Sequence, residues 1–200
     1  WLFVILKEND SYYIQLIFEI SCRSGHLDII KWLFSVEEVD INHTTYNWDT
    51  YIIESAFMMA CKNGHRNIVE WLILLEGIII NFLDSIAYAF EEGQLDVVKL
   101  LYSFNDSIHY KKHYMFYDAC TSGYLDLAQW LYYTSKEDNS RLTLDISFNK
   151  TFSFVCGKGH LKVAKWLFSI TTIDIHMTED YLFKDSPINI LIWLRSLDDQ

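Results

Sequence analysis

Three cysteine–histidine pairs at one spacing are the residues of this sequence best suited to chemistry. In each pair the Cys precedes the His by four positions: the pairs are Cys22 with His26, Cys61 with His65, and Cys156 with His160. Thiol and imidazole groups at such a spacing could be zinc ligands, or a nucleophilic thiol beside its general base. They could also be the imprint of a repeated structural unit. The secondary structure around these residues decides whether they form a zinc site, a catalytic thiol or part of a structural repeat.

The pairs lie in segments that recur around five glycines. With Gly25, Gly64, Gly93, Gly123 and Gly159 as anchors, the segments are FEISCRSGHLDIIKWLF, FMMACKNGHRNIVEWLI, IAYAFEEGQLDVVKLLY, FYDACTSGYLDLAQWLY and FSFVCGKGHLKVAKWLF. Positions are counted from the anchor, so that Phe18 is at −7 and Leu33 at +8. The apolar positions recur at spacings of three and four, the period of an amphipathic helix. Since Gly readily adopts φ > 0, each unit is predicted to be a helix, a Gly turn and a second helix.

Units of this kind stack into a solenoid, in which each repeat buries its apolar face against its neighbours. We expect one solenoid over 1–200, with full repeats at 13–42, 52–81, 82–109, 112–147 and 148–176, partial repeats at 1–12 and 179–197, and insertions at 43–51 and 133–143. Motifs such as DIN (40–42) follow the second helices and predict a turn or short hairpin. Because both ends look apolar and residue 1 is Trp rather than Met, we expect the chain to continue, or another surface to cover these ends.

The units resemble ankyrin repeats. The core A-C-x-x-G-H-x-x-I-V-x-W-L, seen at 60–72, matches the helix–Gly–helix part of that family, and DIN matches its hairpin end. The resemblance implies a mainly α fold, an ankyrin-type helix-turn-helix solenoid with short hairpins or loops between repeats. The T-P-L-H opening of the family is absent. The version with CKNGH and KWLF, rich in Ile, Tyr, Phe and Asn, looks like the ankyrin proteins of giant DNA viruses.

The repeat argues against metal or thiol chemistry. The cysteines all occupy position −3: Cys22, Cys61, Cys120 and Cys156. Equivalent positions of stacked helices lie roughly 10 Å apart, too far for a shared zinc ion or a disulfide, so we expect buried thiols. Histidine at +1 gives way to Gln94 and Tyr124 in two units, which favours capping of a helix N–H over a general base. No catalytic residue, metal ligand or cofactor site is predicted, and the chain is predicted not to be an enzyme.

Composition narrows the classes of partner. The 200 residues are 51% apolar with a net charge of −11, which indicates a folded chain that repels nucleic acids and anionic membranes. No apolar run is long enough to span a bilayer. Four cysteines in a chain of this length favour a reducing compartment. We therefore expect an intracellular protein of the cytoplasm, or of the host cytoplasm if it is viral, with a virion location left open and the oligomeric state undetermined.

The candidate partner-binding residues fall in three groups. By resemblance, positions −2 and −1 face the concave groove of an ankyrin domain, which gives Arg23, Ser24, Lys62, Asn63, Glu91, Glu92, Thr121, Ser122 and Lys158. The first insertion adds Tyr46, Trp48 and Asp49, and a basic hairpin tip adds Tyr110, Lys111 and Lys112. Trp48 is the one Trp outside the repeat phase; it is either a binding hot spot or a local anchor on the solenoid.

These residues predict a non-catalytic module that binds a partner protein, with no nucleic acid and no membrane as partner. The resemblance to viral ankyrin proteins implies an adaptor that acts on host proteins. Two alternatives stay open: a structural component of a virion or assembly, and the ankyrin portion of a larger multidomain protein.

Overall fold

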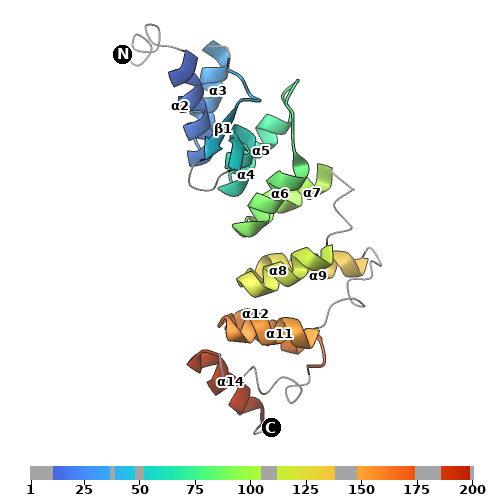
Figure 1. Cartoon of the computed structure of the whole chain (residues 1–200). Coiled ribbons are helices and arrows are strands. Elements are labelled where there is room, and N and C mark those ends of the chain that lie inside the picture. Colours follow the sequence, from blue (N-terminus) through green and yellow to red (C-terminus); the bar gives the residue numbers. More distant parts are fainter. Residues whose placement is uncertain are drawn as a thin grey trace. The chain divides into compact units, whose positions relative to one another are not determined.

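The computed structural model of the chain describes residues 11–36, 39–47, 52–104, 112–137, 148–173 and 186–198. They form paired helices and a two-stranded hairpin (Figure 1). The helices are α2 (Ser11–Ser24), α3 (Leu27–Val36), α4 (Ala56–Lys62), α5 (Arg66–Ile73), α6 (Phe82–Glu91), α7 (Leu95–Phe104), α8 (Lys112–Ser122), α9 (Leu125–Glu137), α11 (Phe148–Gly157), α12 (Leu161–Ile170) and α14 (Ile188–Asp198). The chain divides into two compact parts, Trp1–Asp106 and Ser107–Gln200, each of which contains several repeat units.

Each helix pair turns at its anchor glycine. All five anchors have φ between 69° and 87°, the left-handed region in which a Cβ is unfavourable. In the first pair, the N–H groups of Gly25 and His26 both donate to the Ser21 carbonyl at 3.0 Å. These bonds end α2 and direct the chain into α3. The predicted helix–Gly–helix unit is confirmed at all five anchors.

The apolar positions of the repeat form the core. The residues at −7 and +8 are buried in every unit: Phe18, Phe57, Ile86, Phe116, Phe152, and Leu33, Leu72, Leu101, Leu131, Leu167. Position +4 is buried in four units, but Ile29 is 41% exposed while Ile30 is fully buried. Among the described residues, no unit lies on the N-terminal side of α2 and α3 to cover Ile29.

Tryptophan at +7 packs against the aromatic residue at +9 of the preceding unit. The ring centroids lie 5.4 Å apart for Phe34 and Trp71, 5.7 Å for Tyr132 and Trp166, and 5.9 Å for Phe168 and Trp193, with the planes at 87° to 89° in each pair. Such edge-to-face contacts contribute about 0.5–1.5 kcal/mol beyond burial. These Trp residues therefore pack at the seam between units.

The first insertion contributes to a β-hairpin. Strand β1 (Thr44–Asn47) pairs antiparallel with β2 (Ile52–Ser55), with Thr44 opposite Ser55. Polar side chains fix the chain just before β1: the Gln15 amide bonds both the N–H and the carbonyl of Asp40, and Glu19 Oε1 lies 2.6 Å from His43 Nδ1. The hairpin predicted from the DIN motif is therefore present after it.

Asn42 of the DIN motif joins two connections. Its side-chain amide donates to the Gly77 carbonyl at 2.9 Å, and its Oδ1 accepts from the Ile79 N–H at 2.7 Å. An Asn side chain can pair with backbone in this way because its amide carries both a donor and an acceptor. The recurring Asn was visible in the sequence, but this role was not predicted.

The second insertion begins later than the sequence predicts. Residues 133–137 continue α9, where the sequence predicted the start of an inserted loop. Thr134 Oγ1 donates to the Trp130 carbonyl at 2.8 Å, and Ser135 Oγ donates to the Leu131 carbonyl at 2.7 Å. These hydroxyls satisfy carbonyls of the helix itself, which lets polar residues extend it. Residues 138–147 lie outside the described part of the chain.

Candidate protein-binding surface

The four cysteines lie in the core, as predicted. Each is a free thiol with no exposed surface. Burial raises the pKa of Cys156 to about 12, and burial together with the Glu19 carboxylate raises the pKa of Cys22 to about 12. Such thiols stay protonated at neutral pH and make poor nucleophiles. Among the described residues, no group of three or more His, Cys, Asp or Glu side chains is placed to hold a metal ion.

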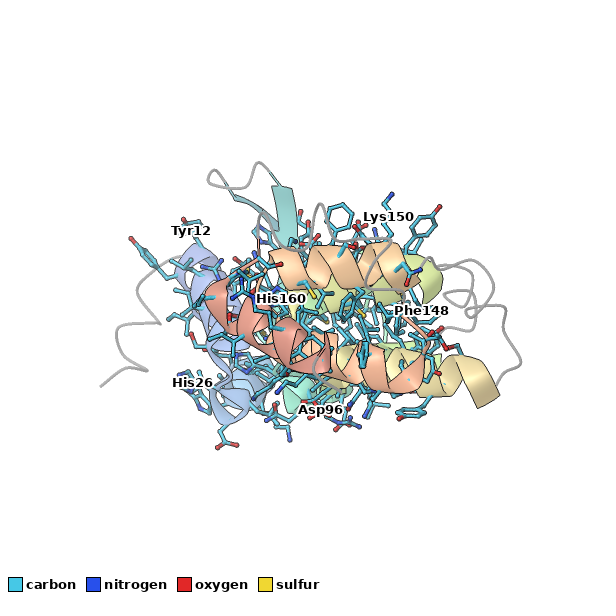
Figure 2. The ribbon with its side chains drawn as sticks, turned by 90° about the horizontal axis from the view of Figure 1, so that it is seen from below. Tyr12, His26, Asp96, Phe148, Lys150 and His160 are labelled. Atoms are coloured by element: carbon cyan, nitrogen blue, oxygen red, sulfur yellow. The ribbon has the colours of Figure 1, made fainter. Side chains whose placement is uncertain are left out.

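The side chain at +1 has a different role from the one predicted. His65 and His160 precede α5 and α12 but make no capping hydrogen bond to them, so the capping prediction is wrong for both. Instead, His65 Nε2 lies 2.8 Å from the Arg23 carbonyl at the end of α2. A Cβ on Gly25 would lie 2.8 Å from His65 Cε1, and one on Gly123 would lie 2.5 Å from His160 Nδ1. The ring at +1 thus sits on the Gly turn of the preceding unit, and Figure 2 shows His160 among the packed helices.

The predicted groove residues with described side chains occupy the last turns of the first helices. Arg23, Ser24, Asn63, Glu91, Glu92, Ser122 and Lys158 are exposed, and Lys62 is half-buried. Thr121 departs from the prediction, because only 6% of it is exposed and its Oγ1 donates to the Asp118 carbonyl at 3.3 Å. It is a helix-internal hydroxyl and offers little surface to a partner.

Two basic groove residues reach over the next unit. Arg23 Nη2 lies 3.5 Å from Met59 Sδ, and Lys62 Nζ lies 5.9 Å from the centre of the Tyr88 ring. A cation over an aromatic ring gains about 0.5–1 kcal/mol at an exposed site. These two side chains therefore link neighbouring repeats in addition to lining the surface.

The remaining predicted residues are only partly covered by the structure. Trp48, Asp49, Tyr110 and Lys111 lie outside the described residues. Tyr46 is part of β1, and Lys112 is the first residue of α8. Whether any of these residues contacts a partner stays a prediction.

An aromatic surface on α8 and α11 was not predicted. Tyr114 is 65% exposed and Phe154 is 46% exposed. Between them, Tyr117 of α8 meets Phe154 of α11 edge to face, at 6.0 Å and 82°. Tyr114, Tyr117 and Asp118 share one helix face because they are three and four residues apart. We call Tyr114, Tyr117, Asp118, Phe154 and Lys158 the α8–α11 face.

The sequence did contain a signal for this face. Tyr114 and Tyr117 stand at −9 and −6, where the alignment has no shared apolar residue. Phe154 stands at −5, which is apolar or aromatic in four of the five units. Aromatic side chains at positions that the repeat does not require are candidates for binding. The predicted groove residues were confined to −2 and −1 and therefore did not include them.

Charges adjoin the aromatic rings of the α8–α11 face. Partial burial raises the pKa of the Asp118 carboxyl, and the nearby Lys158 ammonium opposes the rise. Burial and the Asp118 carboxylate raise the pKa of the Tyr117 hydroxyl. Figure 2 shows Lys150 projecting from α11, the helix that also carries Phe154. The face thus combines aromatic rings, among them the Tyr side chains that are enriched in interface hot spots, with a carboxylate and an ammonium group.

A family model describes most of this architecture. Ankyrin repeats, as a three-copy model, match residues 18–112 and 57–143, which together cover more than half of the chain. The chain belongs to the ankyrin repeat family. Ankyrin domains are generally protein-interaction modules, and no catalytic family matches. A search of curated proteins gives no significant match.

A solved ankyrin structure can be superposed on most of the chain. The crystal structure of the human ASB11 ankyrin repeat domain is 15% identical, with a TM-score of 0.49, and the match covers 79% of this chain and 70% of that one.

In the described residues, no helix is long and apolar enough to cross a membrane.

The ankyrin helices of this chain begin without the family's T-P-L-H opening. Ser55 Oγ accepts from the Met58 N–H at 3.2 Å and caps α4, and Asn81 Oδ1 accepts from the Asp84 N–H at 3.3 Å and caps α6. Ser and Asn are among the best N-cap residues, worth about 1 kcal/mol each. Different residues therefore start these two ankyrin helices.

Proposed function

We propose that this ankyrin domain is a non-catalytic interaction module, and that a partner protein binds the α8–α11 face. The observation that carries the proposal is the aromatic cluster of the exposed Tyr114 and Phe154 and the half-buried Tyr117, beside Asp118 and Lys158. Exposed rings contribute large apolar contact areas at low entropic cost. A partner side chain that excludes water from the rings also strengthens its polar contacts with the neighbouring charges.

The residues predicted at −2 and −1 belong to the same proposal. Ser122 and Lys158 are exposed at the ends of α8 and α11, and they would form a polar rim beside these rings. Ser24, Glu91 and Glu92 are exposed on α2, α6 and their turns, and we propose them as separate partner contacts of Trp1–Asp106. We further propose that the partner is a host protein and that the chain is a viral adaptor. This rests on the Ile-, Tyr-, Phe- and Asn-rich repeats, which resemble those of giant DNA viruses.

A photo-crosslinking experiment followed by titration tests this function. A photoreactive amino acid at position 154 of the intact chain captures the partner from a host lysate, and calorimetry then measures the affinity of the purified partner. Phe154→Ala should weaken binding by at least roughly tenfold, because hot-spot truncation costs about 2 kcal/mol or more. Tyr133→Ala is the matched control, since Tyr133 is 52% exposed but lies on the second helix α9.

Three results would contradict the proposal. Equal affinities for Phe154→Ala and wild type would remove the α8–α11 face from the interface. A loss with Tyr133→Ala of the same size would show that the effect is not local. Substrate turnover by the purified chain alone would show that the module is catalytic.

A further inference from the structure

A second exposed surface lies at the connections between units, on the other side of the repeat from the anchor glycines. Four apolar residues of Trp1–Asp106 are exposed there: Val36 by 40%, Leu74 by 79%, Ile79 by 79% and Phe104 by 52%. Val36 ends α3, Leu74 is the C-cap of α5, and Phe104 ends α7. Ile79 lies in the connection between α5 and α6, which projects beyond both helices (Figure 1). We call these four residues the connection face.

The members of the connection face are neighbours because their helices pack in order. The Phe34 and Trp71 rings join α3 to α5 at 5.4 Å, and α5 packs against α7. Equivalent ends of packed helices lie roughly 10 Å apart. Val36, Leu74 and Phe104 therefore stand at corresponding ends of successive second helices, which sets them apart from single apolar residues scattered over a protein surface.

The repeat does not require Leu74. Position +10 is Ser35, Ser103 or Ser169 in three other units, and each hydroxyl donates to the carbonyl at +7 over 2.6–2.7 Å. Leu74 stands at this position in the second unit, where it cannot make that bond. Leu74 caps α5 only through its backbone N–H, and its side chain is 79% exposed. This side chain is therefore available to a partner.

Acidic side chains flank Leu74 and Ile79 of the connection face. Glu76 and Asp84 are exposed beside Leu74 and Ile79 in the chain, and the sequence has no Lys or Arg between Arg66 and Lys99 or between Lys31 and Lys62. This acidic surrounding attracts cationic groups and repels nucleic acid and anionic membranes.

We propose that the connection face binds a basic amphipathic helix of a partner protein. Two turns of such a helix advance about 11 Å, so apolar side chains at i and i+7 match the roughly 10 Å between neighbouring helix ends. One apolar residue would contact Leu74 and Ile79 and the other Phe104, while Lys or Arg side chains would pair with Glu76 and Asp84. This surface is separate from the α8–α11 face, and it gives the module a second site with a partner of defined chemistry.

Fluorescence anisotropy with a designed probe tests the proposal. The probe is a labelled, idealised Leu/Lys amphipathic helix of about 18 residues, and the comparison peptide has every Lys replaced by Glu. The intact chain should bind the Lys peptide, and less tightly at about 300 mM than at about 50 mM salt. Leu74→Ser combined with Ile79→Ser should weaken binding at least roughly tenfold. Tyr133→Ser, at +10 of the fourth unit, should leave binding unchanged.

Each contrary result overturns the proposal. Equal binding of the Lys and Glu peptides would contradict charge recognition, and unchanged affinity of the double variant would contradict the site. Vesicles containing phosphatidylserine should not bind; binding to them through Leu74 and Ile79 would make this a membrane site. Circular dichroism verifies that the double variant folds; if it does not, Leu74→Ser alone decides, because three other units fold with Ser there. Phe154→Ala should keep full affinity for the peptide, which separates this proposal from the α8–α11 face.

Discussion

Replacing Gly25 with alanine should destabilise the first unit by two separable effects. At φ +87°, an alanine would carry the cost of a left-handed backbone, about 1–2 kcal/mol. Its Cβ would also lie 2.8 Å from His65 Cε1 and 2.9 Å from Nδ1. The His65 imidazole would have to move away and lose its 2.8 Å hydrogen bond to the Arg23 carbonyl, which adds about 1 kcal/mol to the loss of stability. We expect a total loss of about 2–3 kcal/mol in the free energy of unfolding.

Two other glycines provide matched controls for Gly25→Ala. Gly77 has φ +80° but no atom within 4 Å of an added Cβ, so Gly77→Ala should cost only the backbone term of about 1–2 kcal/mol. Gly157 is the last residue of α11, and an added Cβ meets nothing within 4 Å there. Gly157→Ala should therefore be neutral or stabilise by up to about 1 kcal/mol.

A double-mutant cycle isolates the contact between the turn and the ring. His65→Ala removes the ring, so in that background Gly25→Ala should cost only about 1–2 kcal/mol, as Gly77→Ala does in either background. Urea unfolding followed by circular dichroism gives the free energies, and hydrogen exchange of the α2 amides verifies that the loss is in the first unit. If Gly25→Ala lowers the free energy of unfolding by the same amount with and without the His65 ring, then packing of that ring on the turn does not explain why glycine is needed at position 25.

Three further outcomes follow from the structure. Burial raises the pKa of Cys22 and Cys156 to about 12, so the free energy of unfolding should fall as the pH rises above the ordinary thiol pKa of 9, by up to about 1.4 kcal/mol per pH unit and thiol. Urea titrations at successive pH values should show a shallower fall for Cys156→Ala than for the wild type. The same slope in both proteins would contradict this prediction. Trp166 is buried with its Nε1 unpaired among the described residues, so Trp166→Phe should cost less than about 1.5 kcal/mol and Trp166→Ala about 3–5 kcal/mol in thermal or urea unfolding. Asn42→Asp keeps the acceptor for the Ile79 N–H but cannot donate to the Gly77 carbonyl. It should therefore speed amide hydrogen exchange in residues 77–80 and lower the free energy of unfolding by about 1–2 kcal/mol. Unaltered exchange would show that the Asn42–Gly77 hydrogen bond does not form in the native protein.

The periodic part of the fold could be predicted from the sequence because its causes are local. Phe18 and Leu33 fall on apolar helix faces whatever lies next to them, and Gly25 is the residue that tolerates the turn. The same reasoning placed Cys22 in the core without knowledge of its neighbours. Ile29 shows the limit: its burial depends on a preceding unit, which the helix period alone does not supply.

Contacts between units were harder to predict, because they join residues about one repeat apart in the chain. The sequence showed that His65 recurs at one position, and local reasoning assigned it to the helix that follows. The structure places it against the carbonyl of Arg23, 42 residues away. Asn42 and Trp71 likewise pair across a seam that no single window of sequence contains. An aligned repeat predicts that such residues matter, but only stacking in three dimensions shows what they touch.

Stability and binding use different positions of this repeat, and this decides which substitutions can test function. Arg23 and Lys62 were predicted as partner contacts, yet each also lies over a side chain of the next unit, so their removal would change the seam and the surface together. Phe154 is exposed on the first helix of its unit, and Leu74 is exposed at a position that the repeat alignment leaves free. Exposed substitutions away from caps and packed contacts usually change stability by less than about 0.5 kcal/mol. Leu74 caps α5 through its backbone N–H and not through its side chain, so a large loss of affinity at Leu74 would report on binding alone. At Phe154 the edge contact with Tyr117 is a structural cost to subtract.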